Sequence, residues 1–253
     1  MPAAARYRLI SCNVFQRELS FAISQSPNIV DPEFLELGLH EQPGRLFEAL
    51  QARIDAADAA KAPGGEPYDA ILLGYGLCGN GLAGIQARTR PLVLARAHDC
   101  CTLLLGSRAE FLARFGENLS ASWSSVGYIE RGSTYFRASD LGKSSGIGME
   151  YSALVEQYGE ENAAFVWETL HPEIKETELR YIEVPETAGL GHAEIMRAKA
   201  SEEGKEFILI AGNIRLFRGL VAGGWDAAEY LVVPPGSHIE ATWDHDKVYE
   251  ARP

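Results

Sequence analysis

The sequence predicts an α/β protein with a doubly wound, mostly parallel sheet and helices on both faces. Two observations support this prediction. Short continuous apolar runs at 69–74 and 91–95 are typical of parallel strands that are buried on both faces. Segments with helical spacing of apolar residues alternate with such runs along the chain. The 253 residues suffice for one large α/β unit or two modest ones in close contact.

The first half of the chain gives a βαβα beginning and then two buried strands. Pro43 opens an Ala-rich helix that ends at the Pro-Gly-Gly of 63–65. The predicted strands are 7–11, 34–39, 69–74 and 91–95, and the predicted helices are 12–23, 43–62, 82–87 and 102–115.

The second half resumes the alternation after a break. Residues 117–148 are rich in Gly and Ser and lack periodicity, which favours a lid, linker or insertion. Beyond it we expect helices at 149–158, 161–170, 193–201 and 214–222, and strands at 181–184, 207–211 and 230–233. We treat 1–253 as a single α/β unit. A subdivision into 1–116, a linker or lid at 117–148, and 149–253, as two similar βα halves, is left open.

Composition restricts the partners and the location. The formal net charge of −12 disfavours nucleic acid and anionic membrane surfaces. No export signal and no apolar run long enough to span a membrane is found in the sequence, so we expect a soluble, cytoplasmic protein. Four cysteines in a chain of this size favour catalysis or metal binding over a disulfide framework.

Soft and titratable side chains follow three of the predicted strands. Cys12 follows the first strand, Cys78 follows the 69–74 strand, and His98, Asp99 and Cys100 follow the 91–95 strand. The carboxyl ends of parallel strands meet at one edge of a sheet, so we expect these residues to converge there. Thiolate and imidazole ligands suit zinc or iron, and a catalytic site keeps a position open. Cys12, Cys78, His98 and Cys100 are therefore the predicted metal ligands.

Two carboxylates are the predicted catalytic groups. Asp99 would orient the His98 ring or act as a general base on bound water. Glu18 is the second, provided that it faces the crevice; the preferred alternative is a solvated position on its helix. For Cys101, a functional thiol and a small core residue are equally favoured interpretations.

The residues Gly74–Gly79 also match the G-x-G-x-x-G pattern of dinucleotide-binding turns, with Asp99 about twenty residues later. The short helix expected after the turn argues against a nucleotide. The backbone of Gly76, Gly79, Asn80 and Gly81 would equally hold a smaller anion.

A second predicted ligand region lies at Asn213, after the 207–211 strand. Arg215 and Arg218 nearby would meet a carboxylate or phosphate, and salt bridges within this acidic chain are the alternative.

These motifs resemble the family catalogued as domain of unknown function 1638. The resemblance covers residues 7 to about 235, and it is carried by the Tyr75–Gly81 turn, Pro91–Val93, Arg96–Cys100, Leu104–Ser107, Cys12 and Glu18. It implies a setting in anaerobic archaea and bacteria beside corrinoid-dependent methyltransferase systems. Zinc enzymes that transfer methyl groups to thiols use a His-x-Cys pair and a distant Cys, which His98, Cys100 and Cys78 match in type.

The leading hypothesis is a metal-dependent enzyme, a transferase in methyl or one-carbon metabolism that acts on a small molecule. The first alternative is a non-catalytic carrier or chaperone that binds a metal, a cluster or a corrinoid for methyltransferase components. A redox thiol set of Cys78, Cys100 and Cys101 without metal is a further alternative, as is nucleotide binding. Self-association into a homo-oligomer is left open.

Overall fold

The protein is described here by a computed structural model. It describes residues 4–39, 43–77, 80–116, 123–132, 155, 159–160, 177–242, 244 and 247–253. Apart from residue 155, the helices predicted at 149–158 and 161–170 lie outside these residues. Among the residues described, no helix combines the length and apolar character needed to cross a bilayer.

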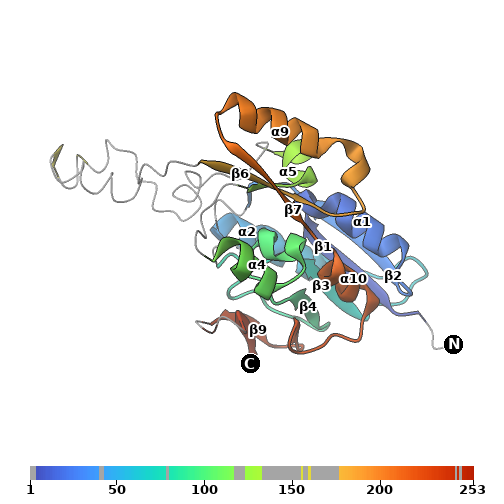
Figure 1. Cartoon of the computed structure of the whole chain (residues 1–253). Helices are drawn as coiled ribbons and strands as arrows, with labels where there is room; N and C mark the ends of the chain where they lie inside the picture. Colours follow the sequence, from blue (N-terminus) through green and yellow to red (C-terminus); the bar gives the residue numbers. More distant parts are fainter. Residues whose placement is uncertain are drawn as a thin grey trace.

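A five-stranded sheet lies at the centre of the described structure (Figure 1). Its strands, in spatial order, are β2 (Ile29–Leu35), β1 (Arg6–Cys12), β3 (Ala70–Gly74), β4 (Leu92–Ala95) and β8 (Tyr230–Val233). The first four are parallel, and β8 runs antiparallel beside β4. Every residue of β3 and β4 is buried, which explains their continuous apolar sequences. The predicted α/β class with a mostly parallel sheet is confirmed.

Helices cover both faces of this sheet. A 3₁₀ turn, η1 (Asn13–Phe15), and helix α1 (Gln16–Ser24) lead from β1 to β2, and α2 (Pro43–Ala59) leads from β2 to β3. These two connections run in opposite directions along the sheet, so right-handed crossovers place α1 and α2 on opposite faces. Helix α10 (Arg215–Ala222) packs beside α1.

The helix predicted over 102–115 is interrupted. The structure has α3 (Cys100–Leu105) and α4 (Arg108–Phe115), separated by Gly106 with a φ of 73°. A Cβ atom on Gly106 would lie 2.6 Å from the Asn213 carbonyl oxygen, so only glycine fits this close approach. The Ser107 hydroxyl then caps α4.

Two other predicted elements differ from the structure. The second strand is 29–35 instead of 34–39. It is an edge strand of the sheet, so it tolerates the polar sequence Asp31-Pro32-Glu33. This polar sequence interrupts the apolar run from which a buried strand is predicted. Residues 80–84 form turns in place of the helix predicted at 82–87.

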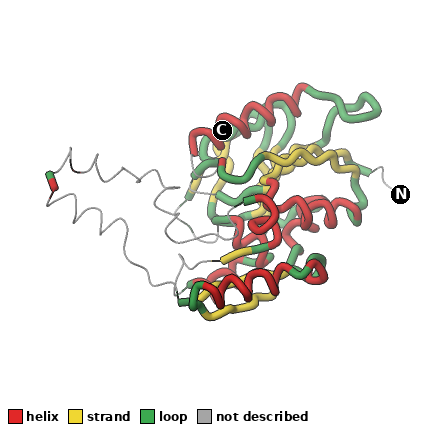
Figure 2. The backbone as a smooth tube through the Cα atoms, turned by 90° about the horizontal axis from the view of Figure 1, so that it is seen from above, coloured by secondary structure: helices red, strands yellow, loops and turns green. Residues whose placement is uncertain are grey.

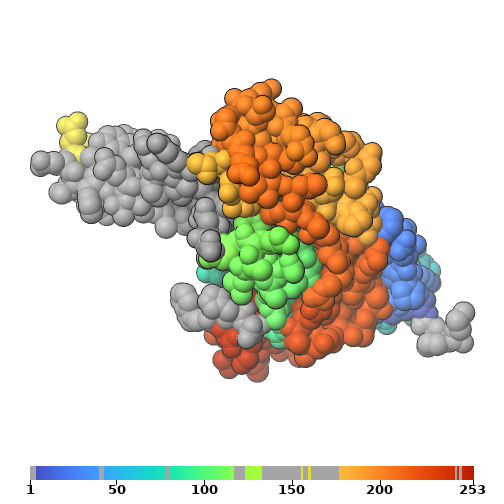
Figure 3. Space-filling model, viewed as in Figure 1, coloured from blue at the N-terminus to red at the C-terminus, as the bar shows by residue number. Residues whose placement is uncertain are grey.

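A second, three-stranded parallel sheet lies beside the first (Figure 2). It consists of β5 (Trp123–Ser124), β6 (Glu178–Glu183) and β7 (Glu206–Ala211), with helices α5 (Val126–Arg131) and α9 (His192–Glu202) against it. In the space-filling view the α9 region forms the upper surface, above α4 and α10 (Figure 3). β5 and α5 belong to the segment predicted as a linker or lid, and their Trp123 and Tyr128 rings are buried 5.0 Å apart.

The chain returns to the first sheet after β7. Helix α10 and strand β8 pack there, and the antiparallel hairpin of β9 (His238–Ala241) and β10 (Tyr249–Arg252) follows. The first sheet therefore contains strands from both ends of the chain, and the second sheet contains strands from the middle. The boundary between the two sheets is not a single position in the sequence such as residue 149. Whether these sheets form one domain or two stays a prediction.

Candidate functional site

The strand order of the first sheet reverses between β1 and β3. The chain leaves β1 toward β2 on one side and leaves β3 toward β4 on the other, which is where doubly wound proteins bind ligands. Cys12 is the last residue of β1, and Tyr75 directly follows β3. Since Ser11 pairs in register with Gly74, Cys12 and Tyr75 emerge at the same level of the sheet.

A small cavity lies at this carboxyl edge. Its volume is ≈ 20 Å³, which is room for about one water molecule or one ion. The connections after β1, β2, β3 and β4 all contribute to its wall, and α5 of the second sheet closes it. The lining residues among those described are Cys12, Val14, Phe15, Glu36, Leu37, Leu39, Tyr75, Cys100 and Tyr128.

Two thiols face this cavity from different strands. Cys12 is 8% exposed, and burial raises the pKa of its thiol to about 11, against a smaller lowering by the Val14 backbone N–H. Cys100 is half-buried at the first position of α3, and its Sγ lies 3.5 Å from the Tyr128 hydroxyl. The structure thus brings together Cys12 and Cys100, as the strand order predicts.

Asp99 caps α3. Its Oδ1 accepts hydrogen bonds of 2.8 Å from both the backbone N–H and the hydroxyl of Thr102. Burial raises the pKa of this carboxyl, and the bonds from Thr102 oppose that rise. The position of Asp99 therefore fixes the start of α3, and with it Cys100. Its predicted roles toward His98 and toward water stay predictions.

The glycine turn packs tightly against the same segment. A Cβ atom on Gly76 would lie 2.8 Å from backbone atoms of Asp99, and the Leu77 N–H donates a 2.9 Å hydrogen bond to the Ala97 carbonyl. Gly76 is needed for this approach of two backbones. Within the described part of the turn, the contact accounts for the glycine without a ligand.

The predicted four-ligand metal set is described only in part. Cys78 and Gly79 lie outside the described residues. His98 is half-buried in the turn between β4 and α3, and it does not line the cavity. Among the described residues, no three His, Cys, Asp or Glu side chains lie close enough to share an ion. Cys12 and Cys100 are therefore the described ligand candidates that share a cavity.

Glu18 is buried on α1. Its side chain is inside the protein at 1% exposure, so the alternative of a solvated helix position is wrong. Neither carboxyl oxygen has a hydrogen-bond partner among the described residues. Burial is the main cause that raises the pKa of Glu18 to about 7; the negative charge of Glu130 adds to the rise, whereas the Glu18 backbone N–H and the positive charge of Arg17 oppose it. Glu18 does not line the cavity, and its catalytic role stays a prediction.

Asn80 and Gly81 are the remaining predicted binding residues of the glycine-rich turn that the structure describes. Asn80 is exposed with a φ of 69°, and Gly81 is buried. Residues 80–91 contain no helix, so the turn lacks the helix N-terminus on which a dinucleotide pyrophosphate would rest.

The Asn213 region is held by ion pairs. The Asn213 Oδ1 accepts a 2.9 Å hydrogen bond from the Arg215 N–H at the start of α10. Arg215 pairs with Glu229 at 2.5 Å, and Arg218 pairs with Glu186 at 2.9 Å. Both arginines thus form salt bridges within the chain, which is the alternative to binding a carboxylate or phosphate ligand.

The family comparison matches residues 34–214 to a model described as a protein of unknown function, DUF1638. The chain belongs to this family. No curated protein and no solved structure matches it.

The residues matched to the DUF1638 model include most of those that line the small cavity. The match includes the positions of Tyr75, Cys100 and Tyr128, but it begins after Cys12 and Glu18. Sequence reasoning missed both tyrosines. Tyr75 lies within the glycine-rich turn, so its place beside the site follows from that motif. Tyr128 lies in the segment 117–148, whose sequence has no periodicity from which a site residue could be predicted.

Proposed function

We propose that this DUF1638 protein is a metal-dependent enzyme that binds zinc or iron at the carboxyl edge of the first sheet. The observation that carries the proposal is that Cys12 and Cys100, from β1 and α3, line one ion-sized cavity at the reversal of strand order. Cys78 is the third ligand that the sequence predicts, and His98 is the fourth.

The chemistry of the donors fits such an ion. Thiolates are ligands that zinc and iron prefer, and a cavity of ≈ 20 Å³ suits an ion better than an organic cofactor. With a pKa of about 11, the Cys12 thiol is neutral at pH 7 unless a cation stabilises its thiolate. A metal would supply that stabilisation and would be released as the ligands are protonated.

The chain's own residues would shape the reaction. When bound, the ion would act as a Lewis acid toward a thiol, a water or a methyl-bearing substrate. Phe15, Leu37 and Leu39 exclude water from the cavity wall. Asp99 fixes the first turn of α3, and Tyr128 supports the Cys100 sulfur.

The pathway follows from the family resemblance alone. We propose methyl-group or one-carbon metabolism in the cytoplasm, with a small-molecule substrate and corrinoid methyltransferase components as partners. The acidic composition supports a partner other than nucleic acid or an anionic membrane.

One observation favours the carrier alternative. The cavity has room for an ion and little else, which a protein that stores or delivers a metal would also need. Mixing the metal-loaded protein with a chelator such as zincon or ferrozine separates the two functions. We expect a carrier to give up its ion to the chelator readily and an enzyme to retain it.

The first experiment is elemental analysis of protein purified without oxygen and without affinity-column metal. We expect about one zinc or iron per chain. Cys12→Ser and Cys100→Ser should lose the ion, and Cys78→Ser tests the third predicted ligand. Cys101→Ala is the matched control, because Cys101 is fully buried and does not line the cavity.

Circular dichroism establishes that each variant is folded. Folded wild-type protein that contains no metal and takes up neither ion on dialysis would overturn the proposal. Full metal content in both the Cys12 and the Cys100 variants would do the same.

A further inference from the structure

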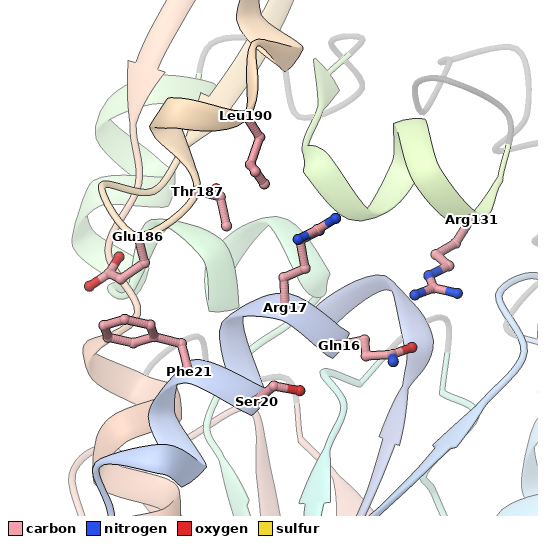
Figure 4. Close-up of a pocket in the computed structure, with 8 residues that line it drawn as sticks. All are labelled: Gln16, Arg17, Ser20, Phe21, Arg131, Glu186, Thr187 and Leu190. Atoms are coloured by element: carbon pink, nitrogen blue, oxygen red, sulfur yellow. The ribbon is translucent and has the colours of Figure 1, made fainter.

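A second, larger cavity lies between the two sheets. It is a cleft of ≈ 500 Å³, within the size range of small-molecule sites. One wall is α1 and the other is α5 together with the segment after β6 (Figure 4). The residues that line this cleft are Gln16, Arg17, Ser20, Phe21, Arg131, Glu186, Thr187 and Leu190.

Most charges at the cleft are already paired. The Arg17 Nε donates 2.8 Å hydrogen bonds to both carboxyl oxygens of Glu130. Glu130 also lies 3.5 Å from the His192 Nε2. On the opposite side, Glu186 pairs with Arg218 at 2.9 Å. Both carboxylates are thus engaged by an arginine, although the second carboxyl oxygen of Glu186 has no hydrogen-bond partner among the described residues.

Arg131 is the exception. It ends α5 and forms no ion pair within the part of the chain that the structure describes. Figure 4 shows its guanidinium directed toward the amide of Gln16 at the start of α1. A guanidinium and an amide that converge from two walls offer several N–H donors to one planar anion.

The other side of the cleft is apolar. Leu190 is 46% exposed, although large aliphatic side chains are usually covered. Its side chain points into the cleft, and the Phe21 ring lies across from it on α1 (Figure 4). Ser20 lines the cleft from α1, beside Phe21 (Figure 4). Within the described part of the chain, the cleft therefore combines an arginine that forms no ion pair with an apolar surface.

We propose that the cleft binds a small organic monocarboxylate, with its carboxylate on Arg131 and Gln16 and its apolar body against Phe21 and Leu190. Among the described residues that line the cleft, Arg131 is the arginine without an ion pair, and its charge matches one carboxylate. The carboxylates of Glu130 and Glu186 and the net charge of −12 disfavour a doubly charged phosphate ester. This site goes beyond the proposed metal function and does not depend on it.

The cleft and the metal cavity share two elements. Tyr128 faces the cavity and Arg131 faces the cleft, one turn apart on α5. Likewise, Cys12, Val14 and Phe15 line the cavity, and Gln16, Arg17, Ser20 and Phe21 line the cleft, along the same segment. A ligand in the cleft would thus contact both elements that enclose the cavity.

The test uses a matched pair of ligands of equal size. Phenylacetate and phenylacetamide have nearly the same shape, but the amide lacks the negative charge and has N–H donors in place of one acceptor oxygen. Each is titrated into the full-length protein by calorimetry at low salt. We expect saturable binding of phenylacetate and at least tenfold weaker binding of phenylacetamide. Arg131→Gln should lose at least tenfold in affinity for phenylacetate. Arg114→Gln is the control, because Arg114 is 56% exposed on α4 and does not line the cleft.

The alternatives give distinct results. Tighter binding of phenyl phosphate than of phenylacetate would overturn the monocarboxylate and assign a phosphate ester instead. Equal binding of the acid and the amide, or unchanged affinity in a folded Arg131→Gln variant, would overturn the role of Arg131. No saturation by phenylacetate at tens of millimolar would overturn the site. Metal content read on the same samples keeps these outcomes separate from the metal proposal.

Discussion

Gly127 of α5 packs directly against the carbonyl oxygen of Val14 in η1, and a Cβ atom on Gly127 would overlap that oxygen. The contact joins the second sheet to the segment that follows β1, backbone against backbone. Since Val14 and Tyr128 both line the small cavity, this contact sets the distance between two of its walls.

Gly127→Ala should therefore displace α5. We expect a loss of about 2–4 kcal/mol in the free energy of unfolding, because the obstacle is backbone and cannot rotate away. Metal content should fall with it. Urea unfolding followed by tryptophan fluorescence measures the first effect, and elemental analysis measures the second.

Gly44→Ala is the control for this change. Gly44 lies in the first turn of α2, and no atom of the described residues lies within 4 Å of a Cβ atom placed there. The same substitution should be neutral or stabilise by up to about 1 kcal/mol, because alanine favours helix. Equal effects at the two glycines would contradict the close contact.

The sequence predicts the centre of the fold well, for a physical reason. β3 and β4 are buried on both faces and so must be continuous apolar runs, and α2 is a long Ala-rich helix that begins at a proline. The meeting of Cys12 and Cys100 follows from the parallel strands before them. None of these features requires knowledge of distant contacts.

What the sequence does not predict depends on contacts between distant segments. The edge strand β2 contains Asp31-Pro32-Glu33 and pairs with β1 alone. The short α5 owes its position to the contact of Gly127 with η1, and no periodicity marks that contact. Tyr128 and Arg131 were therefore absent from the predicted site, although each lines a cavity.

Two substitutions of Asp99 separate its role as the cap of α3 from a role that needs its negative charge. Asp99→Ala should lower the free energy of unfolding by about 1 kcal/mol, because the Thr102 N–H loses its acceptor. Asp99→Asn should cost only a few tenths, since the amide oxygen accepts the same bond. Chemical denaturation of both variants checks this order. If Asn proves as costly as Ala, the negative charge of Asp99 matters beyond the cap.

The raised pKa of Cys12 predicts slow alkylation. In metal-free protein, a thiol with a pKa of about 11 is only about 0.03% thiolate at pH 7.5, and the thiolate is the reactive form. Its rate of modification by iodoacetamide should rise about tenfold per pH unit up to pH 10. Peptide mapping by mass spectrometry reads Cys12 separately from the other cysteines. A plateau near pH 9 would indicate an ordinary, accessible thiol.

Glu18 predicts how stability changes with pH. A folded pKa of about 7, against about 4.3 in the unfolded chain, means that the native state binds more protons between these values. Stability should therefore fall as pH rises from about 4.5 to 7, by up to about 3 kcal/mol from this group. Glu18→Gln is neutral at every pH and should lack that part of the slope.

Urea unfolding at half-unit steps from pH 5 to 8 measures the difference between wild type and Glu18→Gln. The variant should gain on the wild type from pH 5 to about 7 and the difference should level off between pH 7 and 8, whatever the cost of burying an amide, because that cost does not vary with pH. Glu110→Gln is the control, since Glu110 is 57% exposed on α4. Parallel curves for wild type and Glu18→Gln would mean that a partner compensates the buried carboxylate, as a cation bound beside Glu18 would do.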